Sequence, residues 1–332
     1  MPERCPPLRY LALSGNGDCS GGLAIGPTAA PNVAKLSSPR LEQLPALVAE
    51  LTALAENRPP VNATLRKPLF ATSSMGGARP KTTVVDRDSH WLVKPGLATD
   101  TVVLALLEHA THQWGRAAGL RFAETVHHPI TPGRGAVRVL RFDRLGAQRR
   151  MSISAASLLQ VSCLPALESE HSGASYPRLA EELRRIGAPP EDWKELFGRM
   201  IFNAVVGNGD DHPRNHAAVY LHEERRWRLA PAFDVVPNPE LLPRQLFLQV
   251  SAGRWDISRD GLLADFRRFG FHSQAEAAKQ LDTSLKAINE SFPLIAPMLD
   301  KELKNLLAQR LSTNIALLSG PATAPPRKCV VK

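Results

Sequence analysis

The residues best suited to chemistry stand in one short stretch beyond the middle of the chain. Asp210 and Asn215 have the D-x-x-x-x-N spacing of a kinase catalytic loop, in which the Asp handles a hydroxyl proton and the Asn holds Mg²⁺. Asp234 follows a hairpin-like segment, where such enzymes place a second metal-binding carboxylate. Two acidic groups and an amide brought together by one hairpin indicate a site for Mg²⁺ and a nucleoside triphosphate.

A phosphate-binding loop and its cation are predicted upstream of this stretch. Residues 73–81 form a small-residue loop whose paired glycines let backbone N–H groups approach phosphate, and its apolar flanks are strand candidates. Residues 82–93 alternate about a polar turn, which predicts a β-hairpin ending in Lys94, where kinases place the cation for the α- and β-phosphates. Glu108 lies in the next predicted helix, where both an ion pair with Lys94 and an exposed side chain fit the spacing.

Hydrophobic spacing predicts the elements that hold these groups. The clearest amphipathic helix, Pro190–Val206, stops at Gly207 and gives the loop around Asp210 a rigid base. A strand over 136–142 follows a Pro/Gly connection at 128–135 and leaves a small β-rich lobe, so its backbone is the candidate hinge that contacts adenine. Further helices are expected from Ser38 to Asn57, from Asp100 as N-cap to Gly119, and over 155–161, 177–186 and most of 257–320, with short strands over 217–221 and 227–229.

Composition bounds the class of protein. A length of 332 residues predicts two domains or one two-lobed domain, and a hydrophobic fraction of 43% supports a sizeable core. The formal charge of +9 favours polyanionic partners such as nucleotides, nucleic acid or an acidic protein, but the basic residues are spread along the chain. Four scattered cysteines, no apolar run near ~18 residues and no signal-peptide core predict a cytoplasmic protein without a membrane segment.

These patterns together predict an α+β, two-lobed protein-kinase-like fold. We expect a β-rich N-lobe over residues 1–145 with the Gly-rich loop and Lys94, and a mainly helical C-lobe over 146–320 with the catalytic loop and Asp234. The Pro-rich, basic segment 321–332 is expected to be a disordered tail.

Two other functions fit parts of the same pattern. His212 and His216 have i, i+4 spacing and, with the nearby Asp residues, suggest a metal-dependent hydrolase. Pro213 disfavours a continuous helix that would present both rings on one face, and this hypothesis leaves Lys94 without a role. The second alternative is a non-catalytic nucleotide-binding regulator. Its usual mark is loss of the strand Lys, the loop Asp or the metal Asp, and all three candidates are present.

With these residues in view, the chain resembles the HipA family of bacterial serine/threonine kinases, the toxins of toxin–antitoxin pairs. The resemblance runs from about Leu8 to Leu318, and Glu108 followed by residues 116–120 fits the first large helix of the family. Its most specific marks are the motifs at Ser74–Lys81 (SMGGARPK), Arg141–Arg144 (RFDR), Gly207–Asn215 (GNGDDHPRN) and Leu229–Asp234 (LAPAFD).

The resemblance implies a role for each candidate site residue. Asp210 is implied to be the catalytic base, Asn215 and Asp234 to bind Mg²⁺, and Lys94 to contact the phosphates of ATP. Nucleotide contacts are further implied for the Gly-rich loop, for the first large helix, for the hinge backbone and near the catalytic loop, at Ser74, Met75, Gly76, Gly77, Ala78, Glu108, Arg141, Phe142 and His212. Family members autophosphorylate a Ser of the Gly-rich loop and so switch off; Ser74 aligns best with that position, beside Ser73.

The resemblance also implies partners. It implies protein substrates, with aminoacyl-tRNA synthetases as the known class, whose phosphorylation stalls translation. It implies an antitoxin of the helix-turn-helix type, so that DNA is reached only through that partner. The chain departs from the family at its start, where the N-terminal subdomain is largely missing and residues 1–30 are expected to be its remnant.

Overall fold

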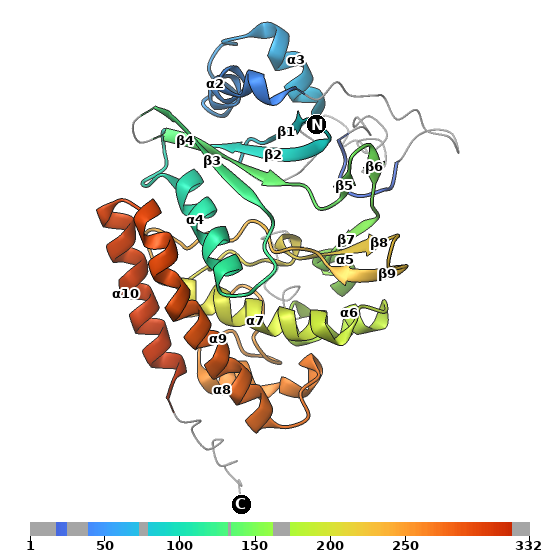
Figure 1. The fold of residues 1–332 in the computed structure, drawn as a ribbon, viewed down its shortest axis with the longest axis vertical. Helices are drawn as coiled ribbons and strands as arrows, with labels where there is room; N and C mark the ends of the chain where they lie inside the picture. Colours follow the sequence, from blue (N-terminus) through green and yellow to red (C-terminus); the bar gives the residue numbers. More distant parts are fainter. Residues whose placement is uncertain (1–17, 25–38, 73–78, 132–133, 162–172, 321–332) are drawn as a thin grey trace, which may run out of the picture.

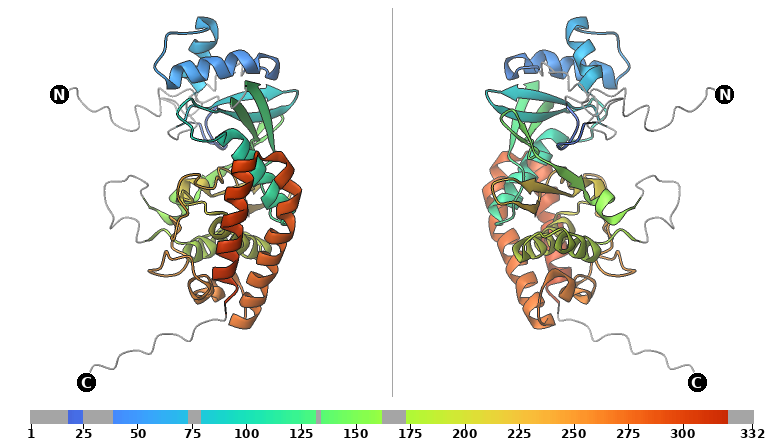
Figure 2. Two further views of the ribbon diagram at one scale, coloured as in Figure 1. Left: turned by 90° about the vertical axis from the view of Figure 1, so that its left-hand side faces the viewer. Right: turned by 90° about the vertical axis from the view of Figure 1, so that its right-hand side faces the viewer.

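The computed structural model describes residues 18–24, 39–72, 79–131, 134–161 and 173–320. Figure 1 shows a small lobe with a β-sheet stacked on a larger, mainly helical lobe, and the side views in Figure 2 show the same division. The sheet comes first in the chain and the helices of the large lobe follow, which confirms the predicted α+β architecture. The segments 73–78 and 321–332 lie outside the described residues, so the predictions for them stay predictions.

A four-stranded antiparallel sheet forms the small lobe. Its strands, in spatial order, are β1 (Thr82–Asp86), β2 (Ser89–Pro95), β4 (Arg134–Leu140) and β3 (Thr125–Thr131). β1 and β2 form the predicted hairpin, with Thr82 opposite Val93. The irregular connection predicted over 128–135 was wrong, because most of it pairs as β3 with β4. Pro129 fits there because β3 is an edge strand, where a missing N–H is tolerated.

Two helices cover one side of this sheet (Figure 1). The 3-10 turn η1 (Leu41–Gln43) and α2 (Leu44–Ala55) form within the range predicted for the first helix. The strand expected before the Gly-rich loop was wrong, because the chain there forms α3 (Ala63–Thr72). Asn62 explains this start: its side-chain oxygen accepts the N–H groups of Thr64 and Leu65, at 3.1 and 3.2 Å.

Helix α4 (Leu104–Ala117) joins the lobes, because it contacts strands β3 and β4 as well as the large lobe. Its buried Leu107, Ala110 and Trp114 belong to the main core of the large lobe. The predicted N-cap at Asp100 was wrong, because its carboxylate instead accepts the N–H of Leu97 at 2.8 Å and pairs with Arg79. The helix therefore begins three residues later than predicted, at Leu104 with Val103 as its N-cap.

The large lobe is built around α7 (Pro190–Val206), which is buried along most of its length. Its bounds match the predicted amphipathic helix, and Gly207 ends it in the left-handed conformation, with φ 75°. The other helices of this lobe are α5 (Ala155–Leu159), α6 (Tyr176–Arg185), α8 (Arg259–Ala264), α9 (Gln274–Ile295) and α10 (Lys301–Leu318), and its 3-10 segments are η4 (Pro213–Asn215), η5 (Phe266–Phe269) and η6 (Ala296–Met298). In Figure 2 the long helices α9 and α10 run along the side of the lobe.

Short strands connect the lobes. After β4, the hairpin of β5 (Arg144–Leu145) and β6 (Gln148–Arg149) leads to β7 (Ser152–Ser154). β7 pairs with β8 (Ala217–Leu221), which pairs with β9 (Arg226–Leu229). The rings of Phe142 and Phe233 are in contact, tilted, with 5.4 Å between their centroids, and Phe233 also packs on a small cluster with Val137 and Val139 of the sheet. This contact fixes the segment before Asp234 against both lobes.

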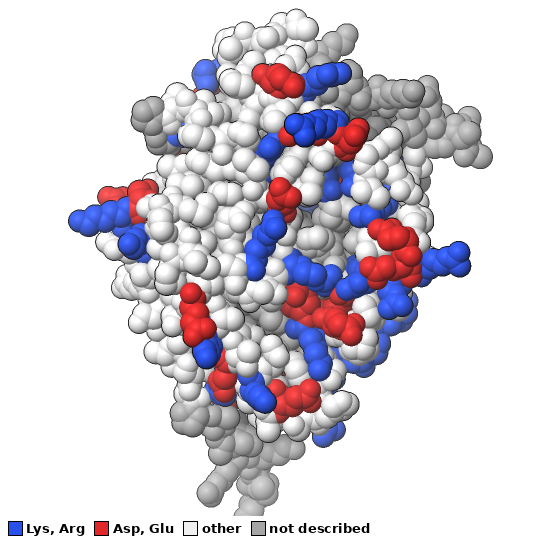
Figure 3. All heavy atoms as spheres, in the orientation of Figure 1, with Lys and Arg blue, Asp and Glu red and all other residues white. Residues whose placement is uncertain are grey.

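The surface mixes charges of both signs. On the face shown in Figure 3, basic and acidic side chains alternate over the half that holds β8, β9 and α6, with no separate basic surface on that face. In the described part of the chain, no helix combines the length and apolar character needed to cross a bilayer.

Candidate active site

A lysine and two carboxylates meet where the lobes face each other. β2 supplies Lys94, α4 supplies Glu108, and the segment after β9 supplies Asp234. Lys94 Nζ lies 2.8 Å from Glu108 Oε1 and 2.6 Å from Asp234 Oδ1. Lys94 and Glu108 are 7% and 5% exposed, so the predicted pair forms and is buried. The fold thus joins three candidate residues that stand far apart in the sequence.

Mutual charge favours the ionised forms of Lys94 and Asp234. Burial disfavours charged Lys94, but Glu108 and Asp234 outweigh it and raise the pKa of Lys94 above its ordinary value. Burial also opposes ionisation of Asp234, yet the neighbouring Lys94 lowers the pKa of this carboxyl to about 2. The pKa of Glu108 is raised because burial outweighs the attraction of Lys94. Asp234 is therefore a permanent anion at neutral pH.

The backbone at Asp234 adopts a conformation that few residue types accept. Asp234 has φ 58°, in the left-handed region that residues other than Gly, Asn and Asp seldom occupy. The preceding residues are clamped: buried Arg199 donates to the carbonyl of Ala230 at 2.7 Å, and the N–H of Ala232 donates to the carbonyl of Arg121 at 2.8 Å. The clamp holds the chain in place while the turn directs the Asp234 carboxylate at Lys94.

The catalytic-loop candidates lie beside this cluster. α7 ends at Gly207, and the loop returns through η4 to Asn215, whose Nδ2 donates to the backbone carbonyl of Asp210 at 2.9 Å. Burial, and then the charge of Asp234, raise the pKa of Asp210, while His212 lowers it. Asp210 and Asp234 are thus close enough for one charge to act on the other.

Sequence reasoning missed a buried network beneath this loop. The Asp211 carboxylate accepts the hydroxyl of Tyr176 and, at 2.8 Å, the N–H of Phe247. Asn203 of α7 donates to the Tyr176 hydroxyl at 2.8 Å. Burial raises the pKa of Asp211 to about 7. Nothing near Asp211 in the sequence indicates Tyr176, because the partner arrives from a different helix.

Lys81 is a second residue without a predicted role. It precedes Thr82, which pairs with Val93, so Lys81 stands next to Lys94 across the β1–β2 hairpin. Burial, and then Lys94, lower the pKa of Lys81, while Asp234 and Glu108 act in the opposite direction. In the sequence, Lys81 is the last residue of the Gly-rich loop and of the SMGGARPK motif.

The hinge residues split between two environments. Arg141 is 5% exposed, and its guanidinium pairs with Asp18 and Asp143. The backbone N–H of Arg141 donates to the carbonyl of His90 at 2.9 Å. The Phe142 ring instead lies half-buried against Phe233. The Arg141 side chain is thus bound within the protein, and the nucleotide contact predicted for the hinge backbone stays a prediction.

The two histidines of the loop, His212 and His216, differ in burial and in their neighbours. His216 is buried against Tyr176, with 5.4 Å between ring centroids, and burial lowers its pKa to about 3. His212 is half-buried with its ring edge-on to Phe247, at 5.9 Å. No three His, Cys, Asp or Glu side chains of the described residues group closely enough to hold a metal by themselves.

The donor set at Asn215 and Asp234 suits a hard divalent cation. The Asn215 amide nitrogen is turned to the Asp210 carbonyl, which leaves its side-chain oxygen as an acceptor. Asp234 adds an ionised carboxylate with one oxygen outside the contact with Lys94. Carboxylate and amide oxygens are the ligands of Mg²⁺, which usually completes its shell with water and phosphate oxygens. The predicted Gly-rich-loop contacts at Ser74, Met75, Gly76, Gly77 and Ala78 lie outside the described residues.

Comparison with known proteins places this site in context. The family described as HipA-like C-terminal domain matches residues 73–293. The protein Y4mE of Sinorhizobium fredii (strain NBRC 101917 / NGR234) is 34% identical over 80 residues, which is 23% of this chain and 19% of Y4mE. The chain therefore matches only about a fifth of the length of this curated relative.

A solved structure shows the same fold. HipA of Shewanella oneidensis MR-1, solved in a complex with HipB and operator DNA, matches with a TM-score of 0.66 and 18% identity, over 90% of this chain and 75% of that one. The Helicobacter pylori kinase CtkA matches with a TM-score of 0.49 and 13% identity, over 71% of this chain and 90% of that one. The first likeness confirms the predicted two-lobed, protein-kinase-like fold.

Proposed function

The chain belongs to the HipA-like C-terminal domain family, and on that premise we propose that it is an ATP- and Mg²⁺-dependent serine/threonine protein kinase. The observation that carries the proposal is the convergence of Lys94, Glu108 and Asp234 next to the loop with Asp210 and Asn215. Phosphoryl transfer asks a protein chiefly for positioning and charge neutralisation, and these groups offer both.

Each residue has a defined task in the proposed reaction. Asp210 receives the proton of the attacking hydroxyl, and its raised pKa makes it a stronger base than an ordinary carboxylate. Lys94 binds phosphate oxygens, held in place by Glu108. Mg²⁺ held by Asn215 and Asp234 would supply positive charge against the phosphates. The backbone around residues 140–142 borders the adenine, and His212 lies on the nucleotide side of the loop.

The partners belong to the same proposal. The Shewanella protein was solved with the antitoxin HipB and operator DNA, and we propose a comparable antitoxin for this chain, with DNA reached only through it. We further propose a cytoplasmic protein substrate of the aminoacyl-tRNA synthetase class and autophosphorylation at Ser74. These points rest on the family resemblance.

Incubation with γ-labelled ATP tests the kinase proposal. Wild type should label itself or a lysate protein, and Asp210→Asn should lose the label while still binding ATP. Asp88→Asn, in the exposed turn between β1 and β2, is the matched control and should retain it. Ser74→Ala should lose self-labelling but keep transfer to other proteins. ATP binding without transfer by wild type would instead support the non-catalytic regulator.

A further inference from the structure

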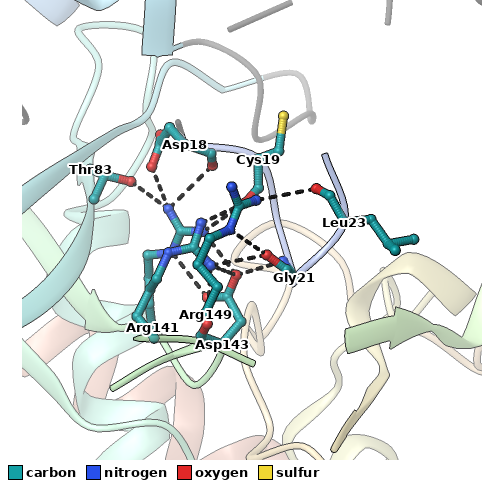
Figure 4. Close-up of polar contacts among 9 residues, drawn as sticks. Asp18, Cys19, Gly21, Leu23, Thr83, Arg141, Asp143 and Arg149 are labelled. Atoms are coloured by element: carbon teal, nitrogen blue, oxygen red, sulfur yellow. Dashed lines mark hydrogen bonds and ion pairs between the residues drawn. The ribbon is translucent and has the colours of Figure 1, made fainter. Parts of the chain in front are cut away.

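A segment far upstream of the hinge is bound to it through Arg141. Residues 18–24, here called the strap, lie against the end of β4 and the β5–β6 hairpin (Figure 4). Arg141 Nη1 donates to the Asp18 carboxylate and, at 2.9 Å, to Thr83 Oγ1 of β1. Arg141 Nε and Nη2 donate to the two oxygens of Asp143, at 3.0 and 2.9 Å. One buried guanidinium thus joins the strap, the sheet and the hinge.

Two more arginines bind the backbone of the strap. The carbonyl of Cys19 accepts Arg144 Nη2 at 2.6 Å and Arg149 Nη2 at 3.1 Å. The carbonyl of Gly21 accepts Arg149 Nε at 2.9 Å, and the N–H of Gly21 donates to Asp143 at 2.8 Å. Figure 4 shows the strap carbonyls turned toward Arg149. Charge-assisted hydrogen bonds of this kind are about twice as strong as neutral ones.

The strap is held by polar contacts. Its large apolar side chain, Leu23, is 70% exposed, whereas Asp18 is 3% exposed. Burial raises the pKa of Asp18 although Arg141 acts in the opposite direction. The strap buries a carboxylate and exposes a leucine, so its charged and polar contacts hold it in position. Its position therefore depends on the arginines that make those contacts.

The strap also reaches the large lobe. A Cβ added at Gly21 would lie 2.8 Å from Ser152 Oγ and 3.2 Å from its backbone nitrogen, and one at Gly22 would lie 3.3 Å from the Met151 side chain. Ser152 begins β7, whose partner β8 directly follows the catalytic loop. The other end of the strap contacts Thr83 of the small lobe through Arg141. The strap therefore contacts both lobes beside the hinge.

We propose that the strap sets the position of the hinge backbone at 140–142 between the lobes, with Arg141 as the positioning residue, and so determines affinity for the nucleotide. This inference rests on the proposed function, because it assigns the hinge backbone to nucleotide contact. Arg141 acts through the backbone that it anchors, whose own N–H is fixed to His90. Displacement by as little as ~1 Å at such a position can lower binding or rate substantially.

A pair of glycines provides the test. Gly21 and Gly146 both have positive φ, 77° and 54°, but a Cβ at Gly146 meets no atom within 4 Å. Gly21→Ala and Gly146→Ala thus share the backbone penalty and differ in the clash with β7. Gly21→Ala should raise the KM for ATP and the Kd for a fluorescent ADP analogue by about tenfold with kcat unchanged, and Gly146→Ala should leave all three at the wild-type values.

Asp18→Asn is the second variant, because it keeps the side-chain shape and removes the charge that faces Arg141. Like Gly21→Ala, it should raise the Kd for the ADP analogue. If Gly21→Ala does not fold, Asp18→Asn alone tests the strap inference. A general loss of folded protein would lower kcat and leave KM unchanged, which would contradict the positioning role. Wild-type nucleotide affinity in both folded variants would overturn the strap inference alone. Failure of wild type to bind nucleotide would overturn the proposed function with it, whereas binding without transfer would remove only the kinase activity.

Discussion

Replacing Lys94 with Met should destabilise the protein far more than replacing Glu108 with Gln, although each change breaks the same ion pair. Lys94 lies between two carboxylates, 2.8 Å from Glu108 and 2.6 Å from Asp234. Lys94→Met leaves both carboxylates without this cation, and removing one partner of a buried pair costs about 3–5 kcal/mol. Glu108→Gln leaves Lys94 with Asp234 and an amide oxygen that still accepts a hydrogen bond, so the expected loss is about 1 kcal/mol.

The double variant makes the reasoning sharper. The three side chains carry a net charge of −1 in wild type and −2 in Lys94→Met, and Glu108→Gln returns the latter to −1. The double variant should therefore be more stable than Lys94→Met alone, with a coupling of about 1–3 kcal/mol. Urea unfolding followed by tryptophan fluorescence measures all four proteins, and transfer from labelled ATP should fall in each variant. Equal losses for the two single variants, or strictly additive losses in the double, would refute the charge argument.

The remaining predictions concern buried groups outside the nucleotide site. Burial lowers the pKa of His112 to about 4, so its contribution to stability is complete above its unfolded pKa near 6.5 and is lost as pH falls through 4. Relative to His112→Phe, the free energy of unfolding of wild type should fall by about 3 kcal/mol over that pH interval. If urea unfolding gives the same dependence of this free energy on pH for both proteins, the prediction is contradicted. Asp192→Asn weakens bonds to Arg121, Arg228 and the N–H of Leu229 and should cost about 3 kcal/mol, whereas exposed Glu191→Gln in the same turn should stay within about 0.5 kcal/mol. A comparable change in both would argue against the buried network.

Features governed by local rules were predictable from the sequence. α7 follows the apolar spacing that ends at Gly207, and the β1–β2 hairpin follows the alternation around its polar turn. For Glu108 the sequence left two interpretations open, an ion pair with Lys94 and an exposed side chain. The ion pair is present in the structure because β2 and α4 lie on adjacent sides of the same site. The order of the motifs along the chain was enough to predict the fold. Each motif marks a helix or strand, and short connections determine which elements lie next to it.

Features that depend on distant partners were missed. Residues 125–131 become a strand because the edge of the sheet tolerates Pro129. The helix over residues 63–72 is a different kind of miss, because its Asn62 cap is a local signal that the sequence does contain. The predicted nucleotide contact of the backbone around Arg141 stays a prediction, but no pattern indicated that the Arg141 side chain pairs with Asp18, 123 residues earlier. No local pattern records such a pairing, because its energy arises only when the fold excludes water from both groups.

The charge arrangement of the site bears on how metal and nucleotide would bind together. Lys94 and Asp234 neutralise each other at 2.6 Å, so each would have to exchange that partner for a ligand. Phosphate alone would draw Lys94 away and leave the carboxylate of Asp234 without a cation, and a metal alone would leave Lys94 with Glu108 as its remaining carboxylate. When both ligands are present, Asp234 gains the metal as Lys94 gains the phosphates, and no charge is left uncompensated. Affinity for each ligand should therefore rise with the concentration of the other, by the same factor in both directions.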